Sequence, residues 1–189
     1  MRRRLIPLLS FGLLVTVACT ADQPPRDQAE GDLQLQPTLD AATSLGVRNA
    51  RMPAPGLLTA GQLTEEQLHG LAAAGFQNFI SFSLAEEDGA GWEERYAPGE
   101  GVSFTRVPVP GGAGLNRETA EELARLLDAA GDEGTVLYCA SSNRAGALMA
   151  LKAFWVDGAT PAEALELGKA SGMTRLEPTV RQMLELSEN

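Results

Sequence analysis

Cys139 and Arg144 are the residues whose types and spacing most clearly indicate chemistry. An apolar run, residues 135–138, predicts a buried strand before the cysteine, and residues 145–156 predict a helix after the arginine. A loop between a strand and a helix N-terminus binds anions, because its N–H groups and the helix dipole point at the ligand. The same field favours a thiolate, which is a nucleophile, over a thiol.

The loop between these two residues therefore predicts a phosphate site. The planar guanidinium of Arg144 matches two phosphate oxygens. A nucleophile inside an anion cradle implies a covalent thiol-phosphate intermediate on Cys139. The alternative is a buried, inert cysteine beside a helix start. On the first interpretation Cys139 and Arg144 are catalytic, and the phosphate is held by five consecutive residues: Ala140, Ser141, Ser142, Asn143 and Arg144.

Strand and helix signals alternate along the chain and predict the frame around this loop. Capping boxes at Thr64 and Thr160 and a cap at Asn116 predict three helices, and further helical segments are expected at 92–96 and from Pro178. Apolar or alternating runs predict strands over 57–60, 76–82, 102–107 and 135–138. This order predicts an α/β fold, with a mostly parallel central sheet and helices on both faces.

A parallel sheet of this kind also predicts where the site lies. Ligands bind beyond the carboxyl ends of the strands, which is where the Cys139 loop leaves its own strand. Residues 110–114 contain a proline and three glycines and follow the end of the preceding strand. We expect this second loop to lie over the same pocket.

The N-terminus indicates export. Three arginines, an apolar run over 5–18 and then Cys19 are typical of a signal, residues 1–18, followed by a lipidated cysteine. We expect a protein anchored to the membrane by lipid on the periplasmic side; plain secretion as a soluble protein is the alternative. The polar, proline-containing stretch 19–52 is predicted to be a disordered tether, and 53–189 a single phosphatase-like domain.

Composition excludes several classes of partner and cofactor. The formal net charge of −10 argues against nucleic acid and against adhesion to anionic lipid, so the lipid anchor is the only membrane contact expected. There is one histidine, no zinc-type Cys/His cluster or Walker-type loop is visible, and we expect no cofactor. Cys139 would have no disulfide partner if Cys19 carries lipid, which favours a chemical role for the thiol. Nothing in the sequence indicates an oligomeric state.

The Cys-x4-Arg loop, residues 58–62, the segment 75–82 and the segment 107–109 together resemble the bacterial beta-lactamase hydrolase-like phosphatase family. This family is related to dual-specificity protein phosphatases, and the resemblance covers residues 55–185. It implies a cysteine-phosphatase-like fold and hydrolysis of phosphate monoesters on phosphorylated small molecules or proteins. It also implies Cys139 as nucleophile, Arg144 as phosphate ligand, and no metal.

The sequence departs from the family pattern at four places. Tyr138 stands where His is frequent, Ser142 where Gly is usual, and Ala145 where a hydroxyl is frequent. The loop 108–116, which normally carries the general acid, has no Asp or Glu; the nearest acids are Glu118 and, from another loop, residues 86–88.

Two alternatives remain beside the phosphatase, one suggested by these departures and one by the Cys-x4-Arg loop itself. One is a catalytically impaired domain that binds a phosphorylated ligand without turnover. The other is a rhodanese-like sulfurtransferase, because that class also joins a strand, Cys, four residues, Arg and a helix.

Overall fold

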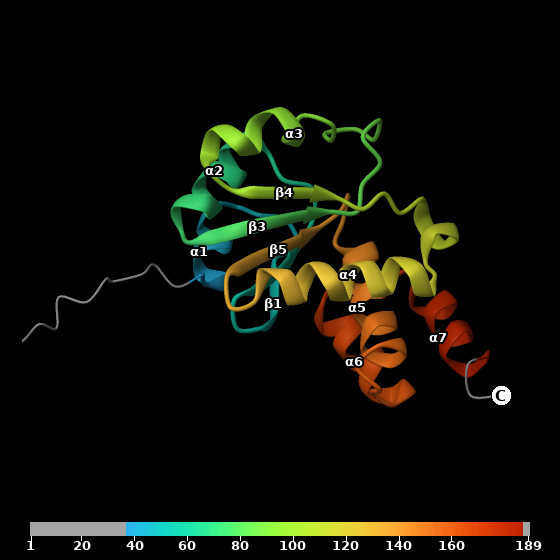
Figure 1. Ribbon diagram of the computed structural model, residues 1–189. Coiled ribbons are helices and arrows are strands. Elements are labelled where there is room, and N and C mark those ends of the chain that lie inside the picture. Colours follow the sequence, from blue (N-terminus) through green and yellow to red (C-terminus); the bar gives the residue numbers. More distant parts are fainter. Residues whose placement is uncertain (1–36, 187–189) are drawn as a thin grey trace, which may run out of the picture. The chain divides into compact units, whose positions relative to one another are not determined.

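The computed structural model describes residues 37–186, which form a five-stranded sheet between two sets of helices (Figure 1). The strand order is β1-β2-β5-β3-β4. Strands β2, β5, β3 and β4 are parallel, whereas β1 is antiparallel to β2. The predicted mostly parallel sheet is therefore confirmed. The strands are β1 (Arg51–Ala54), β2 (Leu57–Ala60), β3 (Phe76–Ser81), β4 (Ser103–Arg106) and β5 (Gly134–Tyr138).

Helices cover both faces of the sheet, as predicted, and each face has its own apolar core. Side chains alternate along β5, so Val136 packs into one core and Leu137 into the other. The core on the Val136 side contains residues of α1 (Leu39–Ser44) and α2 (Glu65–Ala73). The core on the Leu137 side is built with α4 (Arg117–Ala130), α5 (Asn143–Trp155), α6 (Pro161–Ala170) and α7 (Glu177–Leu186).

Three helices begin where the sequence predicts them. Thr64, Asn116 and Thr160 each accept a hydrogen bond from the backbone N–H three residues later, and the side chain at that later position completes the capping box. The expected short helical segment is α3 (Glu93–Tyr96), which continues into the 3₁₀ turn η1 (Ala97–Glu100). A second 3₁₀ turn, η2 (Gly111–Gly114), forms within the glycine-containing loop. None of the helices within residues 37–186 is long and apolar enough to cross a membrane.

The prediction of a disordered tether up to residue 52 is wrong for residues 37–52. Thr38 caps α1, and the side chains of Ala42 and Val47 are buried in the core on the α2 side. Edge strand β1 then begins at Arg51. This segment has weak periodicity, and its order comes from packing against distant parts of the chain. The predicted signal 1–18, the lipidation site Cys19 and the first part of the tether lie outside the described residues.

Candidate active site

The Cys139 loop leaves the carboxyl end of β5, at the centre of the sheet. The Cys139 N–H lies 3.4 Å from the carbonyl oxygen of Ala60 in β2, and the Phe82 N–H donates to Tyr138 on the other side. A bridge joins Gly61 to Ser141. Both neighbouring strands therefore fix the start of the loop, as expected for a ligand site in a parallel sheet.

The carbonyl groups of the loop are held by side chains of the segment before β1. Arg48 donates from Nη2 to the carbonyl oxygen of Ala140, and Asn49 Nδ2 donates to that of Ser141 at 3.1 Å. The N–H groups of residues 140, 141, 143, 144 and 145, by contrast, have no hydrogen-bond acceptor within the described part of the chain. Five backbone donors are thus left for a ligand or solvent. This is the arrangement that an anion-binding loop requires.

Ser142 adopts the left-handed conformation that a glycine would adopt without strain. Its φ is 69° and its ψ is −12°, immediately before α5. Its buried hydroxyl donates to the carbonyl oxygen of Ser171 at 3.0 Å. A non-glycine residue in this region costs about 1–3 kcal/mol. The hydrogen bond to Ser171 offsets part of that cost.

Arg144 is buried under the loop and has several partners. Its Nη1 donates to the carbonyl oxygens of Phe82 at 3.1 Å and Val109 at 2.9 Å. Both terminal nitrogens also donate to the carboxylate of Glu87, at 2.6 and 2.5 Å. Hydrogen bonding by Glu87 raises the pKa of Arg144, and the nearby Cys139 sulfur raises it further. The guanidinium is therefore a fixed positive charge beside the cysteine.

None of the acidic residues named from the sequence is placed as a protonated general acid in the site. Hydrogen bonding by Arg144 holds the pKa of Glu87 below its usual range, so at neutral pH this carboxylate has no proton to donate. Glu86, Asp88 and Glu118 are exposed. Glu87 is better described as the residue that orients Arg144.

A cavity of about 290 Å³ opens over the loop. Gly111 of the 110–114 loop lines it, which confirms that this loop lies over the same pocket as Cys139. No residue of its lining is acidic. The lining comes from the Cys139 loop, the 110–114 loop and the α6–α7 connection: Gly111, Cys139, Ala140, Ser141, Asn143, Arg144, Arg175 and Leu176.

A polar cluster lies beneath the site on the α3 side of the sheet. Glu93 is completely buried, and its carboxylate accepts hydrogen bonds from Gln62, Tyr138 and Arg106. Burial, and then the charge of Glu93, raise the pKa of Tyr138, so its hydroxyl stays protonated and donates at 3.2 Å. The Tyr138 hydroxyl thus holds Glu93, which lies at the end of the loop that carries Glu87.

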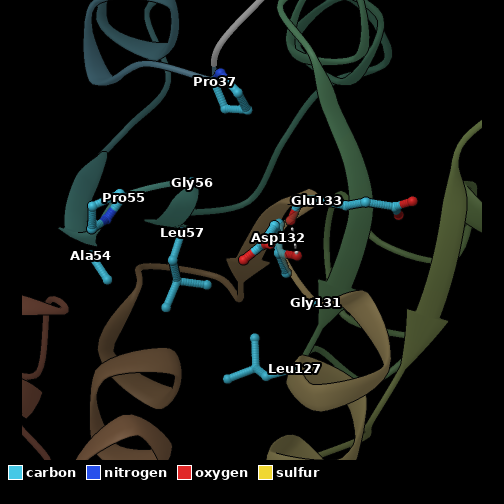
Figure 2. A pocket seen from close by; sticks show the side chains of 10 residues that line it. Pro37, Ala54, Pro55, Gly56, Leu57, Leu127, Gly131, Asp132 and Glu133 are labelled. Carbon is cyan, nitrogen blue, oxygen red and sulfur yellow. Dashed lines mark hydrogen bonds between the residues drawn. The ribbon is translucent and has the colours of Figure 1, made fainter.

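A second cavity lies at the opposite end of the sheet (Figure 2). It has a volume of about 410 Å³ and is formed by Leu57 and Thr135, at the beginnings of β2 and β5, together with the end of α4. Its charged side chains, Asp132 and Glu133, are acidic, and it contains no nucleophilic cysteine. Within residues 37–186 no group of three His, Cys, Asp or Glu side chains is arranged to hold a metal ion. The smaller cavity over Cys139 is therefore the candidate active site.

Three solved structures with a similar arrangement of strands and helices carry the name of a phosphatase or candidate phosphatase. Neither a family model nor a curated protein matches the sequence. A DUF442 protein from Shewanella putrefaciens CN-32, a candidate phosphatase, is 17% identical with a TM-score of 0.62, and the match covers 79% of this chain and 98% of that one. The fold is that of the cysteine-dependent phosphatases.

Two further structures support this assignment of the fold. Tk-PTP in its active form is 18% identical with a TM-score of 0.59, and the match covers 72% of this chain and 96% of that one. TpbA from P. aeruginosa, solved in complex with phosphotyrosine, is 18% identical with a TM-score of 0.51, over 72% and 86% of the two chains. Because the sequence identities are only 17–18%, these similarities show a shared fold.

The roles of three residues at the site are not apparent from the sequence. Glu87 accepts a hydrogen bond from Arg144, which lies 57 residues later in the sequence, and Arg48 donates to Ala140, which lies 92 residues later. Arg175 lies in the connection between α6 and α7 and lines the cavity. No local motif marks any of them. Each of the three carries a charge and lies outside a regular amphipathic pattern. Their charge was therefore the only feature of the sequence that could have indicated a role at the site.

Proposed function

We propose that this protein is a cysteine-dependent phosphatase that hydrolyses phosphate monoesters through a thiol-phosphate intermediate on Cys139. One observation carries the proposal: Cys139 and Arg144 line the same small cavity at the two ends of a loop with unoccupied N–H groups. The fold of the cysteine-dependent phosphatases supports the same reaction class.

The proposed reaction has two displacements at phosphorus. The Cys139 thiolate attacks the phosphorus of the ester, an S–P bond forms, and the P–O bond to the alcohol breaks. Loop N–H groups and Arg144 stabilise the charge on the phosphoryl oxygens in both transition states. Water then attacks the phosphorus, the S–P bond breaks, and inorganic phosphate leaves with the thiolate restored.

The substrate preference follows from the acid-free cavity. A general acid normally protonates the departing oxygen and contributes about 10²–10⁴-fold to the rate. No carboxyl group lines the cavity, and Glu87 is ionised by its contact with Arg144. Aryl phosphates, whose phenoxide leaves without prior protonation, are therefore the proposed substrates, and alkyl phosphates turn over slowly.

We also propose a group of phosphatases and a cellular location for this protein. The motifs at residues 58–62 and 139–144 support membership of the beta-lactamase hydrolase-like group of these phosphatases. The sequence around Cys19 supports a lipoprotein whose domain works on the periplasmic side of a membrane.

A phosphate-binding domain without turnover is the second candidate. The strained backbone at Ser142 and the absence of an acid in the cavity both favour it. On this alternative the loop would bind a phosphorylated ligand and the Cys139 sulfur would remain unmodified.

A phosphate-release assay with an aryl phosphate tests the proposal. We expect release by the wild type, none by Cys139→Ser, and protection of Cys139 from iodoacetate alkylation by phosphate or vanadate. Anion protection without release would support the binding domain. A parallel assay of sulfur transfer from thiosulfate to cyanide tests the remaining alternative, and activity there alone would reject the phosphatase.

A further inference from the structure

Arg175 lines the candidate active site and has no partner among the residues that the structure describes. It lines the cavity beside Ala140 and Ser141, its side chain is exposed, and it makes no hydrogen bond or ion pair within residues 37–186. The nearest acid in sequence, Glu177, pairs instead with Arg181 at 2.8 Å and lies 3.6 Å from Lys169. In a protein with a formal charge of −10, a cation left free in this way is available to a ligand.

The backbone that carries Arg175 is fixed to the Cys139 loop. The side-chain oxygen of Asn143 accepts a hydrogen bond from the Thr174 N–H at 2.8 Å and from the Leu176 N–H at 3.3 Å. One loop residue therefore holds the backbone on both sides of Arg175. This constraint fixes the backbone from which the Arg175 side chain extends and lowers the backbone entropy lost when the guanidinium binds a ligand.

Two further arginines near the loop also lack an acidic partner. Arg48 donates to the Ala140 carbonyl oxygen, and Arg51 donates to that of Asn49 at 3.2 Å. Neither forms an ion pair with a described residue, and the lining of the cavity contains no carboxylate. Arg175 is therefore the one arginine of the cavity lining without an ion pair to a described residue, because Arg144 is paired with Glu87.

We propose that Arg175 binds a second anionic group of the substrate, a carboxylate or another phosphate, beside the phosphate held by residues 140–144. This inference rests on the proposed function, because it takes the loop as the site of the reacting phosphate. The preferred substrate is then a phosphate monoester with a further negative charge close to the ester. Arg175 sets the specificity and takes no part in the bond-breaking steps.

Two aryl phosphates of equal size test the inference. Carboxyphenyl phosphate carries the second charge, and carbamoylphenyl phosphate replaces it with a neutral amide. Binding of each to the Cys139→Ser protein is measured by calorimetry, so that no turnover is needed. We expect the carboxylate ester to bind about tenfold more tightly, the value of one charge-assisted hydrogen bond.

Arg175→Gln in the same background is the decisive variant. The ratio of the two affinities should fall towards one, because glutamine keeps hydrogen-bonding capacity and loses the charge. Arg95→Gln is the matched control: Arg95 is exposed, makes no ion pair with a described residue and does not line the cavity, so the ratio should persist. An equal loss for both esters in Arg175→Gln would overturn the inference, because Arg175 would then bind the reacting phosphate itself.

The remaining outcomes separate this inference from the proposed function. Equal binding of both esters by the parent protein rejects the second anionic group and leaves the phosphatase standing. A tenfold preference in binding, lost in Arg175→Gln and accompanied by no hydrolysis in the wild type, supports the inference and rejects the phosphatase. Binding of neither ester rejects both.

Discussion

Arg144 and Glu87 form a two-point ion pair in which both terminal guanidinium nitrogens donate to one carboxylate. The side chains are 10% and 26% exposed, so solvent screens the pair only partly. Arg144 also donates to two backbone carbonyl oxygens. Its orientation is thus set by the protein before any ligand arrives, which is the condition for efficient electrostatic stabilisation of a transition state.

Glu87→Gln should reduce the stability of the fold. We expect a loss of about 1–2 kcal/mol in the free energy of unfolding at pH 7, because one charge-assisted hydrogen bond becomes neutral. Arg144 lowers the pKa of Glu87 in the folded state from its usual value of 4.5. The contribution is therefore complete above pH 4.5 and disappears as the pH falls through the lowered folded pKa.

Denaturant unfolding of wild type and Glu87→Gln between pH 3 and 8 measures this effect. The difference should be constant above pH 6 and shrink in acid. Glu86→Gln is the control, since Glu86 is the exposed neighbour of the pair. A difference that persists unchanged to pH 3 would contradict an ionic origin.

Cys139→Ser and Arg144→Lys should have separable effects. The serine variant loses the nucleophile and keeps the loop donors, so turnover should vanish while phosphate affinity changes by less than about threefold. The lysine variant keeps the charge and loses the planar fork, so phosphate affinity should fall by about tenfold or more. Calorimetry with inorganic phosphate and an aryl phosphate assay measure the two quantities. Wild-type kinetics in Arg144→Lys would exclude Arg144 as a phosphate ligand.

Ser142→Gly should raise phosphate affinity and activity without loss of fold. Glycine adopts φ 69° freely, which removes the strain, but the hydrogen bond to Ser171 is lost. The strain is about 1–3 kcal/mol and the hydrogen bond about 1 kcal/mol, so the two partly cancel and the free energy of unfolding should change by less than about 2 kcal/mol. Ser141→Gly serves as control, because Ser141 does not have a positive φ. A drop in both affinity and activity for Ser142→Gly would mean that the hydroxyl has a direct role.

Cys19→Ala tests the proposed anchor. The wild-type mature protein is expected to begin at Cys19, to carry acyl chains and to fractionate with membranes, because two chains on one cysteine give stable anchoring. The variant should escape lipoprotein processing and keep the wild-type unfolding transition. Mass spectrometry of the mature N-terminus checks both forms. A soluble wild-type protein without lipid would leave residue 19 as part of a discarded signal.

Local signals in the sequence were sufficient for much of the fold. Capping boxes, the apolar run before Cys139 and the glycines after Pro110 each act within a few residues, so they predict helix starts, the central strand and the loop over the cavity. The left-handed conformation at Ser142 was not predicted, although a glycine is usual at this position in the family that the loop resembles.

Contacts between distant segments could not be predicted in the same way. Strand β1 carries a proline and pairs with β2 through an irregular register, so no clear alternation marks it. The partners of Arg144 and the placement of Arg175 depend on tertiary packing. Glu87 was considered as an acid from its position in the chain, whereas its ionised state follows from an arginine 57 residues away.

The proline in β1 also bears on self-association. β1 lies at one edge of the sheet, where unsatisfied backbone groups could pair with a strand from another molecule. Pro53 has no N–H to offer such a strand, and Arg51 places a charge at the beginning of the same short edge. Substituting Pro53 with a residue that donates would therefore remove a safeguard against aggregation without touching the chemistry at the opposite ends of the strands.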